Sequence, residues 1–224
     1  MEAESNHPLE IRATDNLTAH DAGDSVQFEI KEDPANVLND PKQLGQLRGR
    51  ADAKIKYAKL VLQELKTRER DPGVGRGDDF DRSHEESFLF HLFGALDAFA
   101  EELNIYYGCG LRRAAGEHVS RGKMREALKK QGRKSNELKE IYELEQEKTS
   151  WLFHAEKMRD HSTHLWGVAR TFFGGGVHDG EVWFKNPETQ EDVKQDILVT
   201  FAEWVDAMES LIARLRKSAT EVNK

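Results

Sequence analysis

The stretch FLFHLFGALDAFA, residues 88–100, is the most apolar part of the chain and decides the fold class. Its apolar residues recur at three- and four-residue steps, and the main stripe comprises Leu89, Leu92, Leu96, Phe99, Leu103 and Tyr106. This stripe is widened well beyond a narrow seam by Phe88, Phe90, Phe93 and Ala95. A helix that is apolar over so much of its surface packs against several partners, so we predict a central helix at about 81–107.

Other segments show the same helical periodicity. We predict long helices at about 41–70, 135–172 and 190–217, and a short helix at about 119–131. The dipeptide Asp179-Gly180 lies between two short apolar-containing runs, which predicts a small β-hairpin before the last helix. The predicted fold is an all-α, up-and-down bundle of four main helices. Its predicted core includes Leu62, Leu92, Leu96, Phe99, Leu152, Leu165, Phe201, Trp204 and Leu211.

Charge divides the 224-residue chain into unequal parts, although the length suits one domain. Residues 1–40 contain ten acids and two bases, so they carry the whole formal charge of -8. We predict an acidic N-terminal arm at 1–40 with one short strand around SVQFEI, a bundle domain at 41–217 and a C-terminal tail at 218–224. Within the bundle, residues 111–139 contain ten bases and three acids, a local excess that favours phosphate binding or a solvated helix face.

The cellular setting follows from the cysteine content and the N-terminus. Cys109 is the only cysteine, so no internal disulfide can form. The N-terminus lacks a basic region followed by an apolar core, and the stretch 88–100 is too short to span a bilayer. We therefore expect a cytoplasmic protein without a membrane partner.

Chemistry-bearing residues are concentrated in RDHSTH, residues 159–164, near the end of a long helical pattern. On an ideal helical wheel Arg159, Asp160 and His164 fall in a polar sector away from the apolar stripe. Asp160 and His164 are four residues apart, so they are neighbours on a helix surface, where a carboxylate can orient an imidazole. A polar helix end explains the same composition, and Arg113 and His118 repeat the spacing by chance in a glycine-containing connection.

Three further residues extend this site. Lys148 and Arg170 lie eleven residues on either side of Arg159, so the three cations share one helical stripe that could follow a phosphate backbone. Trp166 falls near Arg159 on the wheel. It could stack on Arg159 or on a base, or it could lie at the edge of the core or in a dimer interface.

Other chemistries are less well supported by the sequence. His161 with His164, or Asp160 with His164, could begin a metal site, but the inward-facing glutamate and histidine motif of a di-metal bundle is absent. Cys109 lies in a helix-ending turn, where a structural thiol is the usual case. The glycine-rich segments lack the lysine of a phosphate-binding loop. We expect neither a metal nor another cofactor.

The chain resembles the HEPN superfamily (higher eukaryotes and prokaryotes nucleotide-binding domain), helical bundles that include many ribonucleases. The signature of that superfamily is an arginine, a polar residue and a later histidine, and RDHSTH matches it through Arg159, Asp160 and His164. The aromatic helix ESFLFHLFGALDAFAEELN, residues 86–104, and the hairpin and helix after RDHSTH also resemble a bacterial subgroup.

This resemblance implies a homodimer in which both subunits contribute to one composite site. It implies metal-independent RNA cleavage, with His164 in proton transfer, Arg159 on the phosphate and Asp160 orienting the pair. It also implies a toxin or defence role with a possible antitoxin or other regulatory partner. A non-catalytic nucleotide-binding or protein-interaction module on the same fold is the alternative.

Overall fold

The computed structural model describes residues 41–69, 79–109, 111, 119–164, 170–172, 174, 176–178, 180–186 and 191–222. The predicted acidic arm and its strand lie outside these residues. The described helices are α1 (Pro41–Glu69), α2 (Asp79–Tyr106), α3 (Arg121–Lys130), α4 (Asn136–Gln146), α5 (Trp151–His164) and α6 (Ile197–Val222). The strands are β1 (Arg170–Phe172) and β2 (Val182–Phe184), and a short 3-10 helix, η2, covers Gly176–His178.

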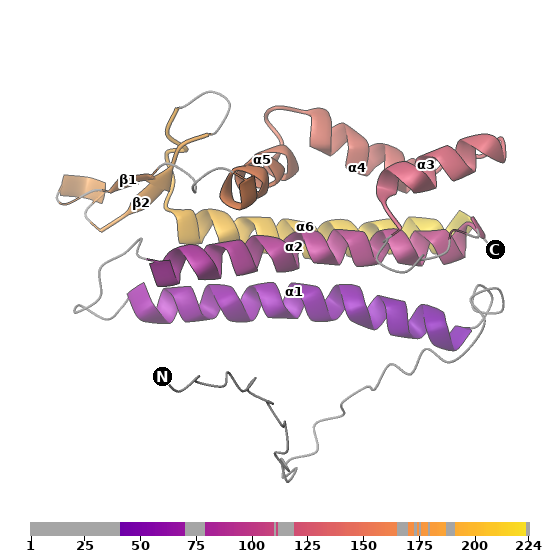
Figure 1. Cartoon of the computed structure of the whole chain (residues 1–224), viewed down its shortest axis with the longest axis horizontal. Coiled ribbons are helices and arrows are strands. Elements are labelled where there is room, and N and C mark those ends of the chain that lie inside the picture. Colours follow the sequence, from indigo (N-terminus) through magenta and orange to yellow (C-terminus); the bar gives the residue numbers. More distant parts are fainter. Residues whose placement is uncertain are drawn as a thin grey trace, which may run out of the picture. The chain divides into compact units, whose positions relative to one another are not determined.

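The helices form the predicted all-α bundle, with α2 between its other parts. Figure 1 shows α1 running antiparallel to α2 on one side, with α6 beside both, and the short helices α3, α4 and α5 on the other side. The small hairpin lies beside the first turn of α6. The bundle is therefore up-and-down as predicted, but the segment between α2 and the hairpin consists of three short helices.

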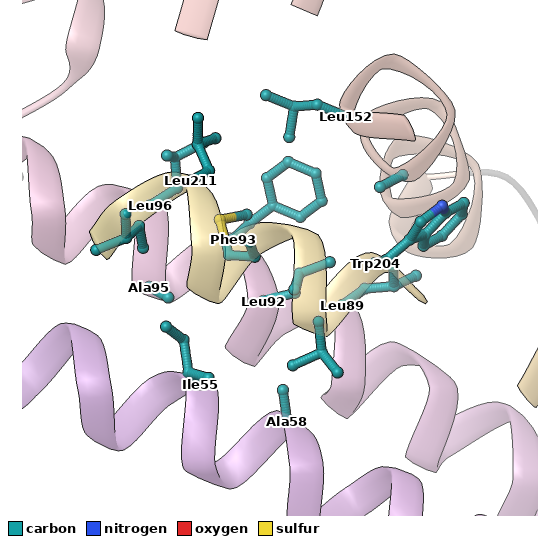
Figure 2. Close-up of a cluster of buried hydrophobic side chains, with 14 of the residues drawn as sticks. Ile55, Ala58, Leu89, Leu92, Phe93, Ala95, Leu96, Leu152, Trp204 and Leu211 are labelled. Carbon is teal, nitrogen blue, oxygen red and sulfur yellow. The ribbon is translucent and has the colours of Figure 1, made fainter. Parts of the chain in front are cut away.

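The core is the one that the periodicity predicts. Eight of the nine predicted core residues are buried, and Leu165 lies outside the described residues. Figure 2 shows side chains of α1, α2, α5 and α6 meeting there, and the rings of Phe88 and Phe201 stack with 4.3 Å between their centroids. None of the described helices combines the length and apolarity needed to cross a membrane.

The prediction of one long helix at 135–172 is wrong. The segment 147–150 separates α4 from α5, and the Ser150 hydroxyl accepts a hydrogen bond from the Phe153 amide at 3.0 Å, as a helix-capping residue does. The break resets the helical phase, so Leu152 and Phe153 are buried while Trp151 is only partly buried. Serines also cap α3 and α4, through Ser120 and Ser135.

The hairpin exists, but its first strand lies earlier than the sequence predicts. β1 pairs antiparallel with β2, with Arg170 opposite Phe184. The first strand thus occupies residues that the sequence assigned to a helix, and Gly180 has a φ of 80°, which suits the turn before β2. Asp196 accepts a hydrogen bond from the Leu198 amide at 2.8 Å, so α6 begins at Ile197 instead of near 190. It continues to Val222, through most of the predicted tail.

Buried charges join the long helices. Glu102 on α2 is fully buried and accepts hydrogen bonds from Arg216 on α6 at 2.6 and 2.8 Å. Arg216 also contacts Asp52 on α1 at 2.6 Å, so one guanidinium connects three helices. This arrangement satisfies a carboxylate that would be very costly to bury alone.

Glu137 at the start of α4 forms a second buried polar centre. Its carboxylate accepts hydrogen bonds from the hydroxyls of Ser135 at 2.8 Å, Ser218 at 2.6 Å and Tyr107. Burial alone raises the pKa of Glu137, but the hydrogen bonds from Ser218, Tyr107 and Ser135 outweigh it and hold the pKa below its usual value. Burial and the hydrogen bond to Glu137 raise the pKa of Tyr107 to about 12.

We expect Glu137→Gln to lower the free energy of unfolding at pH 7 by about 1–3 kcal/mol, because an amide cannot accept from three hydroxyls. Since the folded-state pKa of Glu137 is depressed, its contribution is present above the unfolded pKa and is lost as the pH falls through the lower folded value. Urea unfolding from pH 7 to about pH 3 should therefore show a flatter acid dependence in the variant.

Glu143→Gln is the matched control, because Glu143 lies on the same helix but is exposed. Its effect should stay within about 0.5 kcal/mol. Equal stability and equal acid dependence of wild type and Glu137→Gln would contradict the role given to the buried carboxylate.

Candidate functional site around Arg159

Arg159 lies on α5 directly after Met158, which is buried in the core. Its guanidinium carbon is 4.3 Å from the centroid of the Phe93 ring on α2, and its side chain is 30% exposed. The wheel predicts an outward side chain, whereas the structure lays Arg159 across the boundary between α5 and α2. The aromatic face restricts the guanidinium and keeps one side of it near the surface.

Two carboxylates of α5 hold the same guanidinium. Asp160 accepts from Arg159 Nε at 3.1 Å and from a terminal nitrogen at 2.8 Å, and Glu156 lies 3.6 Å from that nitrogen. Asp160 is therefore a direct partner of Arg159. A phosphate bound by Arg159 would compete with both carboxylates.

A charged cluster continues from Glu156 to α2, α3 and α4. Arg121 on α3 contacts Asp97 of α2 at 2.9 Å and the buried Glu145 of α4 at 2.5 Å. Burial raises the pKa of Glu156, and the neighbouring Glu145 raises it further, while Arg159 and Arg121 lower it. The protonation of Glu156 is thus coupled to charges on α3, α4 and α5, and it contributes to the charge next to Arg159.

The sequence analysis did not predict that Phe93, Arg121, Glu145 and Glu156 belong to the site. Asp97 gave a signal, because an acid inside the apolar stretch 88–100 needs a partner. No comparable signal exists for Arg121, which looks like one base among many in a basic segment. Only the packing of α3 against α2 identifies it as an inward-facing residue.

The other predicted site residues lie on different elements or outside the described residues. His164 is the last residue of α5, so its backbone is on the same helix as Arg159 and Asp160, but its side chain is not among the described ones. Lys148 is exposed in the turn between α4 and α5, and Arg170 begins β1. The predicted single helical stripe of Lys148, Arg159 and Arg170 is therefore wrong. Trp166 lies outside the described residues.

Two further histidines, His154 and His161, lie on α5. His154 is half-buried, and its Nδ1 lies 3.1 Å from the side-chain nitrogen of Asn186. His161 is also half-buried. Among the described side chains, no group of three or more histidine, cysteine, aspartate or glutamate residues could hold a metal ion.

Cys109 follows α2 and is partly buried. Burial raises the pKa of its thiol, and the nearby Arg133 only partly opposes this. A raised pKa lowers the fraction of thiolate at neutral pH, so the surroundings of Cys109 do not favour a nucleophile.

The fold and the cluster define an all-α helical bundle that carries a charged, half-buried arginine site on a short helix. The chain belongs to the family of unknown function DUF6586, whose profile matches residues 46–222. That match runs from the second turn of α1 to the end of α6, so it covers the described bundle. No curated protein and no solved structure matches the chain.

We expect Arg121→Met to destabilise the protein by about 2–4 kcal/mol, because it leaves the buried Glu145 without its cation. Chemical denaturation at pH 7 measures this change. The double variant Arg121→Met/Glu145→Gln should recover much of the loss, since no unpaired charge is then buried.

Lys139→Met removes an exposed i,i+4 pair with Glu143 and serves as the control, with an expected effect below about 0.5 kcal/mol. A double variant that is as unstable as the sum of both single changes would show that Arg121 and Glu145 do not stabilise each other.

Proposed function

We propose that this chain is a metal-independent endoribonuclease of the HEPN type. The observation that carries the proposal is the placement of Arg159, which is held over Phe93 and by Asp160 while its side chain remains partly exposed. A fixed guanidinium at the surface is suited to a phosphodiester, because it binds the phosphate oxygens in a planar, paired fashion. The spacing Arg159, Asp160 and His164 supports the same assignment.

In the proposed reaction His164 takes the proton of an attacking 2′-hydroxyl or gives a proton to the leaving oxygen. Arg159 holds the scissile phosphate and offsets the negative charge that develops on it. Asp160 fixes the guanidinium of Arg159. Each role belongs to a side chain of this chain and needs no metal ion.

The site needs a second copy of the chain. Arg159 and His164 are five residues apart, which on an ideal helix separates their directions by about 140° and their positions by about 7.5 Å along the axis. One Arg–His pair is therefore too widely spread to surround a phosphate. A homodimer that brings two α5 helices together would supply both groups to each site.

One observation favours a second candidate, a non-catalytic nucleotide-binding or protein-interaction module. Arg159 already has two carboxylates of its own helix, Glu156 and Asp160, as partners. Such pairing is what a structural arginine would show. In that case the wild-type chain binds its ligand without cleaving RNA, and ligand affinity depends mainly on Arg159.

A toxin or defence role with an antitoxin or another regulatory protein belongs to the same proposal. It rests on the resemblance to HEPN proteins alone.

Cleavage of labelled RNA by the purified protein tests the enzyme. We expect His164→Ala and Arg159→Ala each to lower the rate by about 10²-fold or more, and Asp160→Ala to lower it less. The rate should persist in EDTA and should change between about pH 5 and 8, where histidines titrate. Arg113→Ala and His118→Ala are matched controls, because they repeat the spacing outside RDHSTH.

The outcomes separate the candidates. RNA that stays intact with wild type over varied sequence and salt rules out the enzyme and leaves the binding module. Activity that EDTA abolishes, with His161→Ala as damaging as His164→Ala, rules out the metal-independent mechanism.

Assembly is tested by light scattering. We expect a dimer at tens of micromolar, because a specific homodimer interface has a far lower Kd, about micromolar or below. Mixing inactive Arg159→Ala with inactive His164→Ala should restore part of the activity if one site takes residues from both subunits. A monomer at these concentrations speaks against the composite site.

A further inference from the structure

Helix α3 and the turn after it carry an exposed cluster of bases, which we call the basic surface. Residues 123–134 contain six bases and one acid, a local charge of 6 − 1 = +5. The six bases are all exposed and are Lys123, Arg125, Lys129, Lys130, Arg133 and Lys134. The single acid, Glu126, is also exposed. Positive charge is thus concentrated in this segment, whereas the whole chain has a formal net charge of -8.

Most of these bases have no neutralising carboxylate among the described residues. Within the part of the chain that the structure describes, no ion pair forms at Arg125, Lys129, Lys130 or Lys134. By contrast, the exposed Lys59 on α1 contacts Glu209 of α6 at 2.6 Å. Positive potential therefore accumulates on α3 instead of being cancelled locally.

The basic surface is presented on a fixed element. Met124 and Leu128 anchor α3 in the core, and Arg121 ties its first turn to Asp97 and Glu145. Gly132 has a φ of 67°, a conformation that ends the helix and turns the chain toward Arg133 and Lys134. A ligand would not have to order this segment when it binds, which removes one cost of association.

An exposed aromatic ring stands beside the bases. Tyr142 on α4 is 44% exposed, and the guanidinium carbon of Arg125 is 4.4 Å from the centroid of its ring. Surfaces that combine cations with accessible aromatic rings bind single-stranded nucleic acids, because the cations hold phosphates while unpaired bases stack on the rings. A duplex keeps its bases stacked inside, so it would use the cations but not Tyr142.

We propose that the basic surface together with Tyr142 binds single-stranded RNA, outside the Arg159–His164 site. The choice of RNA rests on the proposed function. The surface lies on α3 and α4, in the same layer of short helices as α5 (Figure 1), so one strand held there could continue toward Arg159. This surface holds the substrate, whereas RDHSTH carries the chemistry.

Binding is measured by fluorescence anisotropy of a labelled single strand, with the full chain carrying His164→Ala so that the RNA stays intact. We expect Lys129→Glu/Lys130→Glu to weaken binding at least tenfold and to reduce the dependence of affinity on salt, because fewer phosphates are contacted. Tyr142→Leu should weaken single-strand binding about fivefold or more and leave duplex binding unchanged.

Lys56→Glu/Lys59→Glu on α1 is the charge-matched control, since both lysines are exposed and the net charge changes equally. It should alter the affinity less than threefold. Circular dichroism and thermal unfolding of each variant establish that the fold is kept.

Three results would overturn this inference: equal affinity in Lys129→Glu/Lys130→Glu and its control, equal affinity of wild type for single strand and duplex, or competition by poly-glutamate as effective as by RNA. The proposed function fails separately. If wild type binds RNA through the basic surface without cleaving it, this inference holds and the proposed enzyme function is wrong. If wild type cleaves RNA but Lys129→Glu/Lys130→Glu leaves the affinity unchanged, the proposed function holds and this inference is wrong.

Discussion

The burial of α2 is the constraint on which the rest of the structure depends. Its apolar surface is too wide for one partner, so α1, α6 and the short helices α3 and α5 all pack against it. The stacked rings of Phe88 and Phe201 fix α6 on one side, and Phe93 lies toward α5 on another. Of the helices that contribute to the candidate site, α3 and α5 pack directly on α2, and α4 packs on α5 and α6.

Charged residues decide how the helices meet once burial has brought them together. Glu102 with Arg216, Glu137 with its three hydroxyl donors, and Glu145 with Arg121 are each buried or nearly so, and each carboxylate has a specific partner. A shifted helix would leave one of these carboxylates unpaired at a cost of several kcal/mol. The pairs therefore define the register of α1, α4 and α6 more narrowly than apolar contacts alone.

The candidate site and the basic surface use two different properties of the same layer. Arg159 is restrained by Phe93 and by carboxylates, so it is suited to orient one phosphate. The bases of the basic surface are exposed, and most lack such partners among the described residues, so they are suited to hold an extended anion. Arg121 lies on α3 like the basic surface, but it faces inward and pairs with Glu145, whose charge acts on Glu156 next to Arg159. It therefore belongs to the candidate site and not to the basic surface.

The sequence by itself determined the helical class, the central place of residues 88–100 and eight of the nine core residues that it predicts, because apolar periodicity records burial directly. The sequence also contained the signal for the break before α5, because Ser150 is a capping residue. The prediction of one long helix did not use this signal. Only the tertiary structure decided that Arg159 lies over Phe93, that Arg170 belongs to a strand and that Arg121 faces inward. These features depend on contacts between residues far apart in the chain, which periodicity within one segment does not encode.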